Sequence, residues 1–238
     1  MFTYGIPSFH RPECKAIDTL CSLGIEKDRI IVSLQDEQEV HSYEKFHSDV
    51  RYIVRKADCA AGNRNTLLKN LETPLVIIDD DITSFAFKGN KMSSFKKIED
   101  AKSLESIILQ TVDIAKDNDI PIIGCAATSN DLVARNRTRY SYDVLLQGSF
   151  LVFLAPLFFD ERWKMVEDYE LSLRAIRMSH TMRDNYLCAR KPKNGTNKGG
   201  LHERYASNEL PYWVASLGKQ YREFKPNKEM TGGSVRYE

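Results

Sequence analysis

The stretch LETPLVIIDDD (residues 71–81) places four apolar residues, Leu75 to Ile78, directly before three aspartates. A short apolar run without polar alternation is typical of a strand that is buried on both faces, as in a parallel sheet. Similar runs occur at 29–34 and 121–126, and segments between the runs carry apolar residues at helical spacing. The sequence therefore predicts an α/β protein with a Rossmann-like, mostly parallel sheet flanked by helices.

The expected elements follow one another along the chain without an internal repeat or a dividing linker. A chain of 238 residues also fits one domain better than two. The arginine-rich stretch 130–142 is expected to be a loop. We expect strands at 3–6, 29–34, 51–54, 74–78, 121–126 and 150–154, and helices at 12–23, 40–46, 63–70, 98–118, 167–178 and 211–224.

Composition narrows the class of protein. Hydrophobic residues make up 42% of the chain and charged residues 28%, which excludes disordered and collagen-like chains. The longest apolar run, 150–159, is about half of the ~20 residues that a membrane helix needs. The five cysteines are odd in number and never in CxxC spacing, and the first residues do not resemble a signal peptide. We therefore expect a cytoplasmic protein without stable membrane insertion.

The net charge of +1 hides an asymmetry between the two ends of the chain. Residues 171–238 hold 13 Lys and Arg against 6 Asp and Glu, a net charge of +7, so residues 1–170 carry −6. A basic end on an acidic body is typical of a protein that contacts an anionic partner from one side. A solvated lysine-rich surface is the alternative.

The three aspartates after the strand at 74–78 are costly to place together unless something neutralises them. Ligands bind at the carboxyl ends of the strands in open α/β sheets. In an extended segment Asp79 and Asp81 point to the same side, so both can face one cation. Oxygen ligands suit Mg²⁺ or Mn²⁺, which in turn hold a diphosphate. The alternative is an acidic turn that closes the strand.

Two further segments carry weaker indications. Glu167 and Asp168 open a predicted helix, where an acid either complements the helix dipole or serves as a general base. Arg64, in Gly62-Asn63-Arg64-Asn65, is expected either to bind a phosphate or to hold an acidic loop, and a turn capped by Asn is the alternative. The motifs GxGxxG, GxxxxGK[ST] and GxSxG are absent, which disfavours the commonest dinucleotide, phosphate-loop and hydrolase sites.

The order of these segments is more specific than any one of them. IPSFHRPE (6–13), GNRN (62–65), IIDDD (77–81), LLQGS (145–149) and VEDYELSLR (166–174) follow one another along the chain. This order resembles the nucleotide-sugar glycosyltransferases of the GT-A fold. The resemblance implies a nucleotide-binding half (1–90), an acceptor half (91–178) and a basic carboxy-terminal extension (179–238) within one domain.

The resemblance also implies roles for individual residues. Asp79 and Asp81 would bind the metal and the sugar nucleotide, and Asp168 or Glu167 would be the catalytic base of an inverting transfer. The donor is expected to be a UDP-sugar, which is the commonest donor in the family. The residues expected at the nucleotide and its diphosphate are Pro7, Ser8, Arg11, Gly62, Arg64 and Asn65.

Four more residues are candidates for contact with the donor. Gly148, with Ser149, is expected to line the sugar, since a small residue lets the backbone approach a ligand. Lys198 or His202, on the glycine-rich loop, is expected to close over the diphosphate, and His202 is a candidate third metal ligand.

The carboxy-terminal part is similar to a narrower family. NKGGLHERY (197–205) and PYWVASLGKQYREFKPN (211–227) resemble the tail of the TET-associated glycosyltransferases of phages, which are implicated in adding sugar to hydroxymethylated pyrimidines in DNA. This resemblance implies a DNA acceptor and the cytoplasm of an infected host. The basic carboxy-terminal third fits phosphate contacts, and Arg135, Arg137 and Arg139 run into two tyrosines that can stack on bases.

Two other functional hypotheses also fit parts of the sequence. A GT-A enzyme can act on a glycan, a lipid-linked or a protein acceptor, with the basic end facing a membrane surface. The other interpretation changes the class of protein. A sugar-nucleotide pyrophosphorylase generally has a glycine-rich, Arg-containing loop after its first strand, which IPSFHRPE (6–13) does not resemble. A non-catalytic nucleic-acid-binding module would give the three aspartates no purpose. We infer no obligate protein partner.

Overall fold

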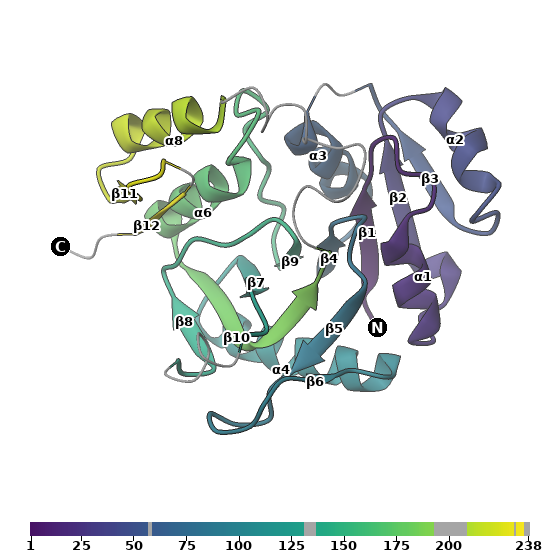
Figure 1. Ribbon diagram of the computed structural model, residues 1–238, viewed down its shortest axis with the longest axis horizontal. Helices are drawn as coiled ribbons and strands as arrows, with labels where there is room; N and C mark the ends of the chain where they lie inside the picture. Colours follow the sequence, from purple (N-terminus) through teal and green to yellow (C-terminus); the bar gives the residue numbers. More distant parts are fainter. Residues whose placement is uncertain (57–58, 131–136, 193–208, 231, 236–238) are drawn as a thin grey trace.

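A single mixed sheet organises the computed structural model, which describes all residues except 57–58, 131–136, 193–208, 231 and 236–238 (Figure 1). Its path is β3-β2-β1-β4-β9-β7-β10-β5-β6, and β8 pairs with β10. The strands are β1 (Thr3–Pro7), β2 (Ile30–Leu34), β3 (Arg51–Val54), β4 (Leu75–Ile78), β5 (Ser84–Phe87), β6 (Lys96–Lys97), β7 (Ile122–Ala126), β8 (Tyr140–Tyr142), β9 (Phe150–Phe153) and β10 (Thr181–Arg190).

Helices cover both faces of this sheet. Alternate residues of β4 point to opposite sides, so Val76 and Ile78 join the core under α1 and α4, whereas Leu75 and Ile77 join the core under α3 and α6. The described helices are α1 (Lys15–Ser22), the short 3₁₀ turn η1 (Lys27–Arg29), α2 (Glu37–Glu44), α3 (Ala60–Asn70), α4 (Ala101–Asp117), α6 (Glu167–Met178) and α8 (Glu209–Gln220). The predicted α/β class is confirmed. None of these helices is long and apolar enough to cross a membrane.

Strand direction decides where the site lies. Strands β1 to β4 are mutually parallel in the order β3-β2-β1-β4, but β9 runs antiparallel to both β4 and β7. Ile78, the last residue of β4, pairs with Phe150, the first residue of β9. The carboxyl ends of β1, β2 and β4 therefore share one edge of the sheet with the segment that precedes β9.

Strand β10 lies inside the sheet, between β7 and β5, although the sequence assigns it to the carboxy-terminal extension. Its centre holds Asp184 and Asn185, and a buried polar pair in a strand is unusual. Both side chains have partners: Thr111 donates to Asp184 (Oγ1 to Oδ2, 3.0 Å), and Asn185 donates to Ser141 (Nδ2 to Oγ, 2.7 Å). Because these partners stabilise the buried polar residues, β10 forms although its sequence is not an apolar run. Part of the stretch predicted as a loop at 130–142 forms β8, which pairs with this strand.

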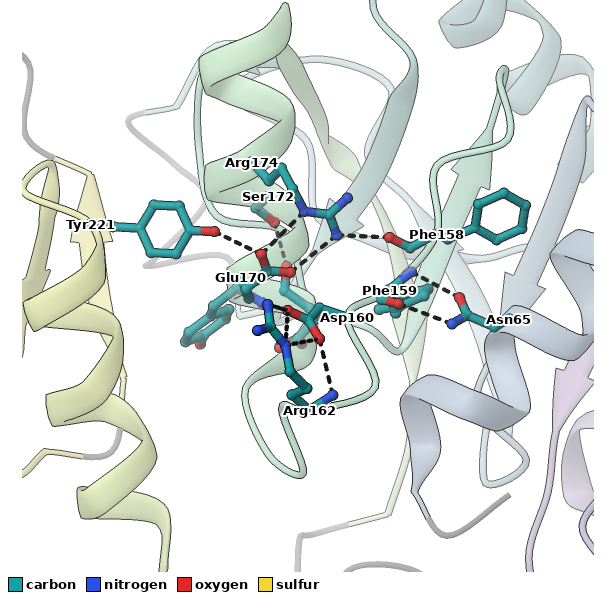
Figure 2. A network of polar contacts seen from close by, with 11 residues as sticks. Asn65, Phe158, Phe159, Asp160, Arg162, Glu170, Ser172, Arg174 and Tyr221 are labelled. Atoms are coloured by element: carbon teal, nitrogen blue, oxygen red, sulfur yellow. Dashed lines mark hydrogen bonds and ion pairs between the residues drawn. The ribbon is translucent and has the colours of Figure 1, made fainter. Parts of the chain in front are cut away.

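The carboxy-terminal segment packs beside α6 (Figure 1). It consists of α8 and the hairpin of β11 (Phe224–Pro226) and β12 (Gly233–Val235). Trp163, which precedes α6, lies 5.6 Å from Trp213 of α8 between ring centroids. The Tyr221 hydroxyl donates to Glu170 of α6 at 2.7 Å, as Figure 2 shows. The segment thus supports the helix that begins with Glu167 and Asp168.

Candidate active site

The three aspartates lie at the carboxyl edge of the sheet, where β4 ends. The amide N–H of Asp79 donates to the Ser149 carbonyl at 3.1 Å, which fixes the triplet beside the segment before β9. Asp80 is buried, whereas the side chains of Asp79 and Asp81 keep 24% and 18% of their surface exposed. The middle carboxylate is therefore buried, and the outer two are partly exposed.

Asp80 is held by the loop after β1. The Ser8 hydroxyl and the Arg11 guanidinium each donate to its carboxylate at 2.6 Å, and the Tyr43 hydroxyl lies 2.7 Å from Ser8 Oγ. Burial raises the pKa of Asp80 to about 6, and the Arg11 charge opposes that rise. Ser8 and Arg11, predicted as nucleotide contacts, are thus also the internal partners of the triplet. Arg11 Nη1 lies 3.7 Å from Asp81 as well.

Arg64 joins the triplet to the start of α6. Its Nη2 donates to Asp79 Oδ1 at 2.9 Å, and its Nη1 forms a short ion pair with Glu167. The side chain is 7% exposed and its guanidinium lies over the Phe159 ring. Among the described residues its Nε has no hydrogen-bond partner. Of the two expectations for Arg64, contact with the acidic segment is the one that the geometry displays.

Asp168, at the start of α6, is a further carboxylate at this edge. The chain enters α6 through Val166, whose φ of 55° is strained for a β-branched residue. Asp168 then accepts N–H donors from Gly148 (2.8 Å) and Tyr169 (2.9 Å). Burial raises the pKa of Asp168 well above its usual range, the neighbouring Glu167 raises it further, and Arg64 counteracts both. A carboxylate with a raised pKa is suited to accept a proton near neutral pH.

Glu167, the alternative base, is placed differently. Its side chain is buried and paired with Arg64, so it has no open side toward an acceptor. Asp168 is partly buried and is bound by two backbone amides. The geometry favours Asp168 over Glu167 as a proton acceptor.

The outer carboxylates fit a divalent cation in one respect. Mg²⁺ is usually held by one or two carboxylates together with substrate phosphates and water, and does not need a full protein cage. Asp79 and Asp81 supply such a pair on the open side of the triplet. In the part of the chain that the structure describes, no three His, Cys, Asp or Glu side chains gather closely enough to hold a metal. His202 and Lys198, predicted to complete the donor site, lie outside the described residues.

Other predicted contacts lie near the edge but do not all face it. Pro7 ends β1 and pairs with Ser33, and Gly62 lies in the first turn of α3. The Asn65 side chain is bound within the protein: it donates to the Phe159 carbonyl at 2.9 Å and accepts from the Phe159 amide at 2.8 Å (Figure 2). Asn65 therefore holds the 158–161 segment in place, because its amide is already fully engaged there.

Two residues at the edge were missed by sequence reasoning. Lys191 follows β10, and its Nζ lies 3.9 Å from Asp79 Oδ2. Asn63 donates to the Ser8 carbonyl at 2.8 Å and so ties α3 to the loop after β1. The lysine was hidden because β10 was not recognised as a strand that ends at this edge. Asn63 lies inside the quoted GNRN motif, where an Asn cap was expected, but α3 begins at Ala60 and Asn63 lies within the helix.

No family model matches the sequence, and no curated protein matches it. Among solved structures, CMP:2-keto-3-deoxy-manno-octonic acid synthetase complexed with CTP is similar at 10% sequence identity and a TM-score of 0.35. The match covers 52% of this chain and 51% of that one, so this chain spans about half the length of the synthetase.

Proposed function

We propose that the protein is a glycosyltransferase that moves a sugar from a nucleotide-diphosphate donor to a hydroxyl group, with 5-hydroxymethylpyrimidine in DNA as the acceptor. One observation carries the proposal. Asp79 and Asp168, 89 positions apart in the sequence, meet at one sheet edge around Arg64 and Gly148. A pair of partly exposed carboxylates beside a carboxylate that can accept a proton is the arrangement that this chemistry needs.

The donor end of the site is formed by the loop after β1 and the aspartate triplet. Asp79 and Asp81 would hold Mn²⁺ or Mg²⁺, which when bound neutralises charge on the leaving diphosphate. Lys191, exposed and 3.9 Å from Asp79, is a second cation at the same place. A UDP-sugar is the donor we propose, with Arg11 and Ser8 bordering its nucleotide. The sugar would lie beside the backbone of the segment that precedes β9, whereas the α-carbon of Gly148 is covered by Arg64.

The acceptor end is formed by Asp168. In the proposed step the acceptor oxygen bonds to the anomeric carbon while the bond from that carbon to the diphosphate oxygen breaks. The diphosphate leaves with the electron pair, and the hydroxyl proton passes to Asp168. The raised pKa of Asp168 supports this role, since a general base works best when its pKa is near the working pH. Attack from the face opposite the diphosphate gives inversion.

The acceptor class rests on charge and resemblance. The net charge of +7 over residues 171–238 is suited to a polyanion such as DNA. Within the arginine stripe at 135–139, Arg139 is bound to the buried Asp184 at 3.2 Å and is therefore a structural residue. Arg137 remains a candidate phosphate contact, and Arg135 lies outside the described residues.

Mass spectrometry of hydroxymethylpyrimidine DNA tests the proposal. The DNA is incubated with the protein, Mn²⁺ and a panel of sugar nucleotides, and the nucleosides are then analysed. We expect a mass gain of one sugar with the wild type and with Arg162→Ala, a surface control whose side chain is 86% exposed, but not with Asp168→Asn. Donor binding or slow donor hydrolysis without a mass gain would move the acceptor to another hydroxyl. The absence of both would overturn the proposal.

A further inference from the structure

The GT-A resemblance places Arg64 beside the donor diphosphate, but its surroundings indicate another role. Two carboxylates from different elements occupy its terminal nitrogens: Asp79 at the end of β4 and Glu167 at the start of α6. With 7% of its side chain exposed, Arg64 has little surface to offer a ligand. Binding a diphosphate would require it to leave Glu167, whose charge would then be buried without its partner.

The guanidinium also contacts the segment that binds Asp168. Arg64 Nη2 lies 3.5 Å from the Gly148 carbonyl oxygen, and the amide of the same Gly148 donates to Asp168 at 2.8 Å. A β-carbon at position 148 would lie 2.6 Å from Nη2, a distance that real β-carbons do not show. The glycine is therefore required by the close approach of Arg64, and one short segment joins the arginine to the proton-accepting carboxylate.

We propose that Arg64 is a positioning residue that ties the end of β4 to the start of α6 and, through Gly148, orients the Asp168 carboxylate. It does not bind the donor. The catalytic meaning of this assignment rests on the proposed function, whereas the structural tie does not. The two terminal nitrogens of Arg64 contact both acidic segments, so the geometry of the site depends on this residue.

Amide hydrogen exchange at residue 148, followed by NMR, tests the tie without any substrate. Two variants weaken it differently. Arg64→Lys keeps a positive charge but has no planar fork, so it cannot serve both carboxylates. Gly148→Ala keeps every charge and displaces Nη2. Arg174→Lys is the matched control, because Arg174 makes a similar bidentate ion pair with Glu170 on the same helix but has no contact with Gly148 among the described residues.

We expect exchange at residue 148 to become at least about tenfold faster in Arg64→Lys, which corresponds to a local loss of a hydrogen bond rather than global unfolding. We expect kcat to fall about 100-fold in both variants, with the donor KM within about threefold of the wild type, because a misplacement of about 1 Å is enough for such a loss. Arg174→Lys should leave exchange and kcat unchanged. If Arg64→Lys does not fold, Gly148→Ala carries the kcat and KM measurement.

Unchanged exchange at residue 148 in a folded Arg64→Lys would overturn the proposal. So would a donor KM that rises about 100-fold while kcat is preserved, because that split identifies a residue that binds the donor in the ground state. A wild type without any transferase activity would refute the proposed function, and the exchange measurement would still decide whether Arg64 orients Asp168.

Discussion

Helix α6 carries two buried glutamates three residues apart, each paired with an arginine, and the two pairs differ in how completely their polar groups are hydrogen-bonded. In the first, Glu167 pairs with Arg64 from α3. In the second, Glu170 accepts from Arg174 through both oxygens (3.1 Å each) and from the Tyr221 hydroxyl at 2.7 Å (Figure 2). Arg174 also donates to the Phe158 carbonyl at 2.7 Å. The second pair thus joins three segments, and both carboxylate oxygens of Glu170 accept hydrogen bonds.

The polar groups at and around the first pair are less completely hydrogen-bonded and less completely buried. The Arg64 Nε has no hydrogen-bond partner in the described part of the chain, and Asp79 beside it is partly exposed. Asp168, next to Glu167, has a raised pKa, and a strained Val166 precedes it. Unpaired hydrogen-bonding groups, backbone strain and a carboxylate with a shifted pKa are typical of sites that bind or react. Residues whose polar groups are all hydrogen-bonded are typically structural. We therefore propose that the first pair positions the candidate site and that the second pair stabilises the fold.

The largest expected effect belongs to Asp168. Asp168→Asn removes the proton acceptor without changing side-chain size, so kcat for sugar transfer should fall about 10³-fold, in the range of lost general-base catalysis. Donor affinity and the unfolding midpoint should change little. A steady-state assay with a calorimetric donor titration checks both. If Glu167→Gln causes this loss and Asp168→Asn does not, the other acid of the pair is the base.

The second pair should show the opposite response. Glu170→Gln removes the charge that holds both Arg174 and Tyr221, and we expect a loss of about 2 kcal/mol in the free energy of unfolding, as for hydrogen bonds to a charged group. The kcat of the folded variant should remain within about twofold of the wild type. Urea denaturation with parallel rate measurements tests this. A stable variant with a large loss of kcat would erase the distinction between the two pairs.

The pH dependence of the rate sharpens the comparison further. Because burial raises the pKa of Asp168 above its usual 3.8, the base is protonated and inactive until the pH exceeds the raised value. The kcat should therefore rise with pH well above pH 4, and the acid limb should disappear in Asp168→Asn. A profile of kcat from pH 5 to 8.5, with circular dichroism at each pH, checks this. A flat profile over that range would contradict the assignment.

The smallest effect concerns Asp80, the interior member of the triplet. Its pKa is about 6 in the folded protein and 3.8 in a model peptide, so the folded state binds the proton more tightly and stability falls as the pH rises through this window. Relative to Asp80→Asn, the wild type should lose about 1 kcal/mol of stability between pH 5 and pH 7.5. Denaturant midpoints of both proteins at the two pH values give the difference. A wild type that gains stability relative to the variant would show that the Arg11 charge outweighs burial.

Much of the fold could be predicted from apolar patterning. Leu75 to Ile78 is a buried strand flanked by helices, as the run without polar alternation indicated. Strand β10 could not be found in this way, because Asp184 and Asn185 are stable in its centre only through partners far along the chain. The antiparallel direction of β9 was also beyond reach, since an apolar run of four residues carries no information on direction.

The site was predicted in part. The positions of Asp79, Asp81 and Asp168 at one edge follow from strand ends and a helix start, which the sequence displays. That Asp80 is interior and that Arg64 pairs with Glu167 depends on side chains that meet only after folding. Lys191 reaches Asp79 because β10 ends at the same edge, which no local pattern reveals.

The most direct test of the proposed donor site at the aspartate triplet is Mn²⁺-dependent binding of a UDP-sugar, measured by calorimetry for the wild type, Asp81→Ala and Glu170→Gln. We predict metal-dependent donor binding in the wild type and in the folded fraction of Glu170→Gln, and the loss of this binding in Asp81→Ala. Tight, metal-dependent binding retained by Asp81→Ala would remove the aspartate triplet from the donor site and contradict the account.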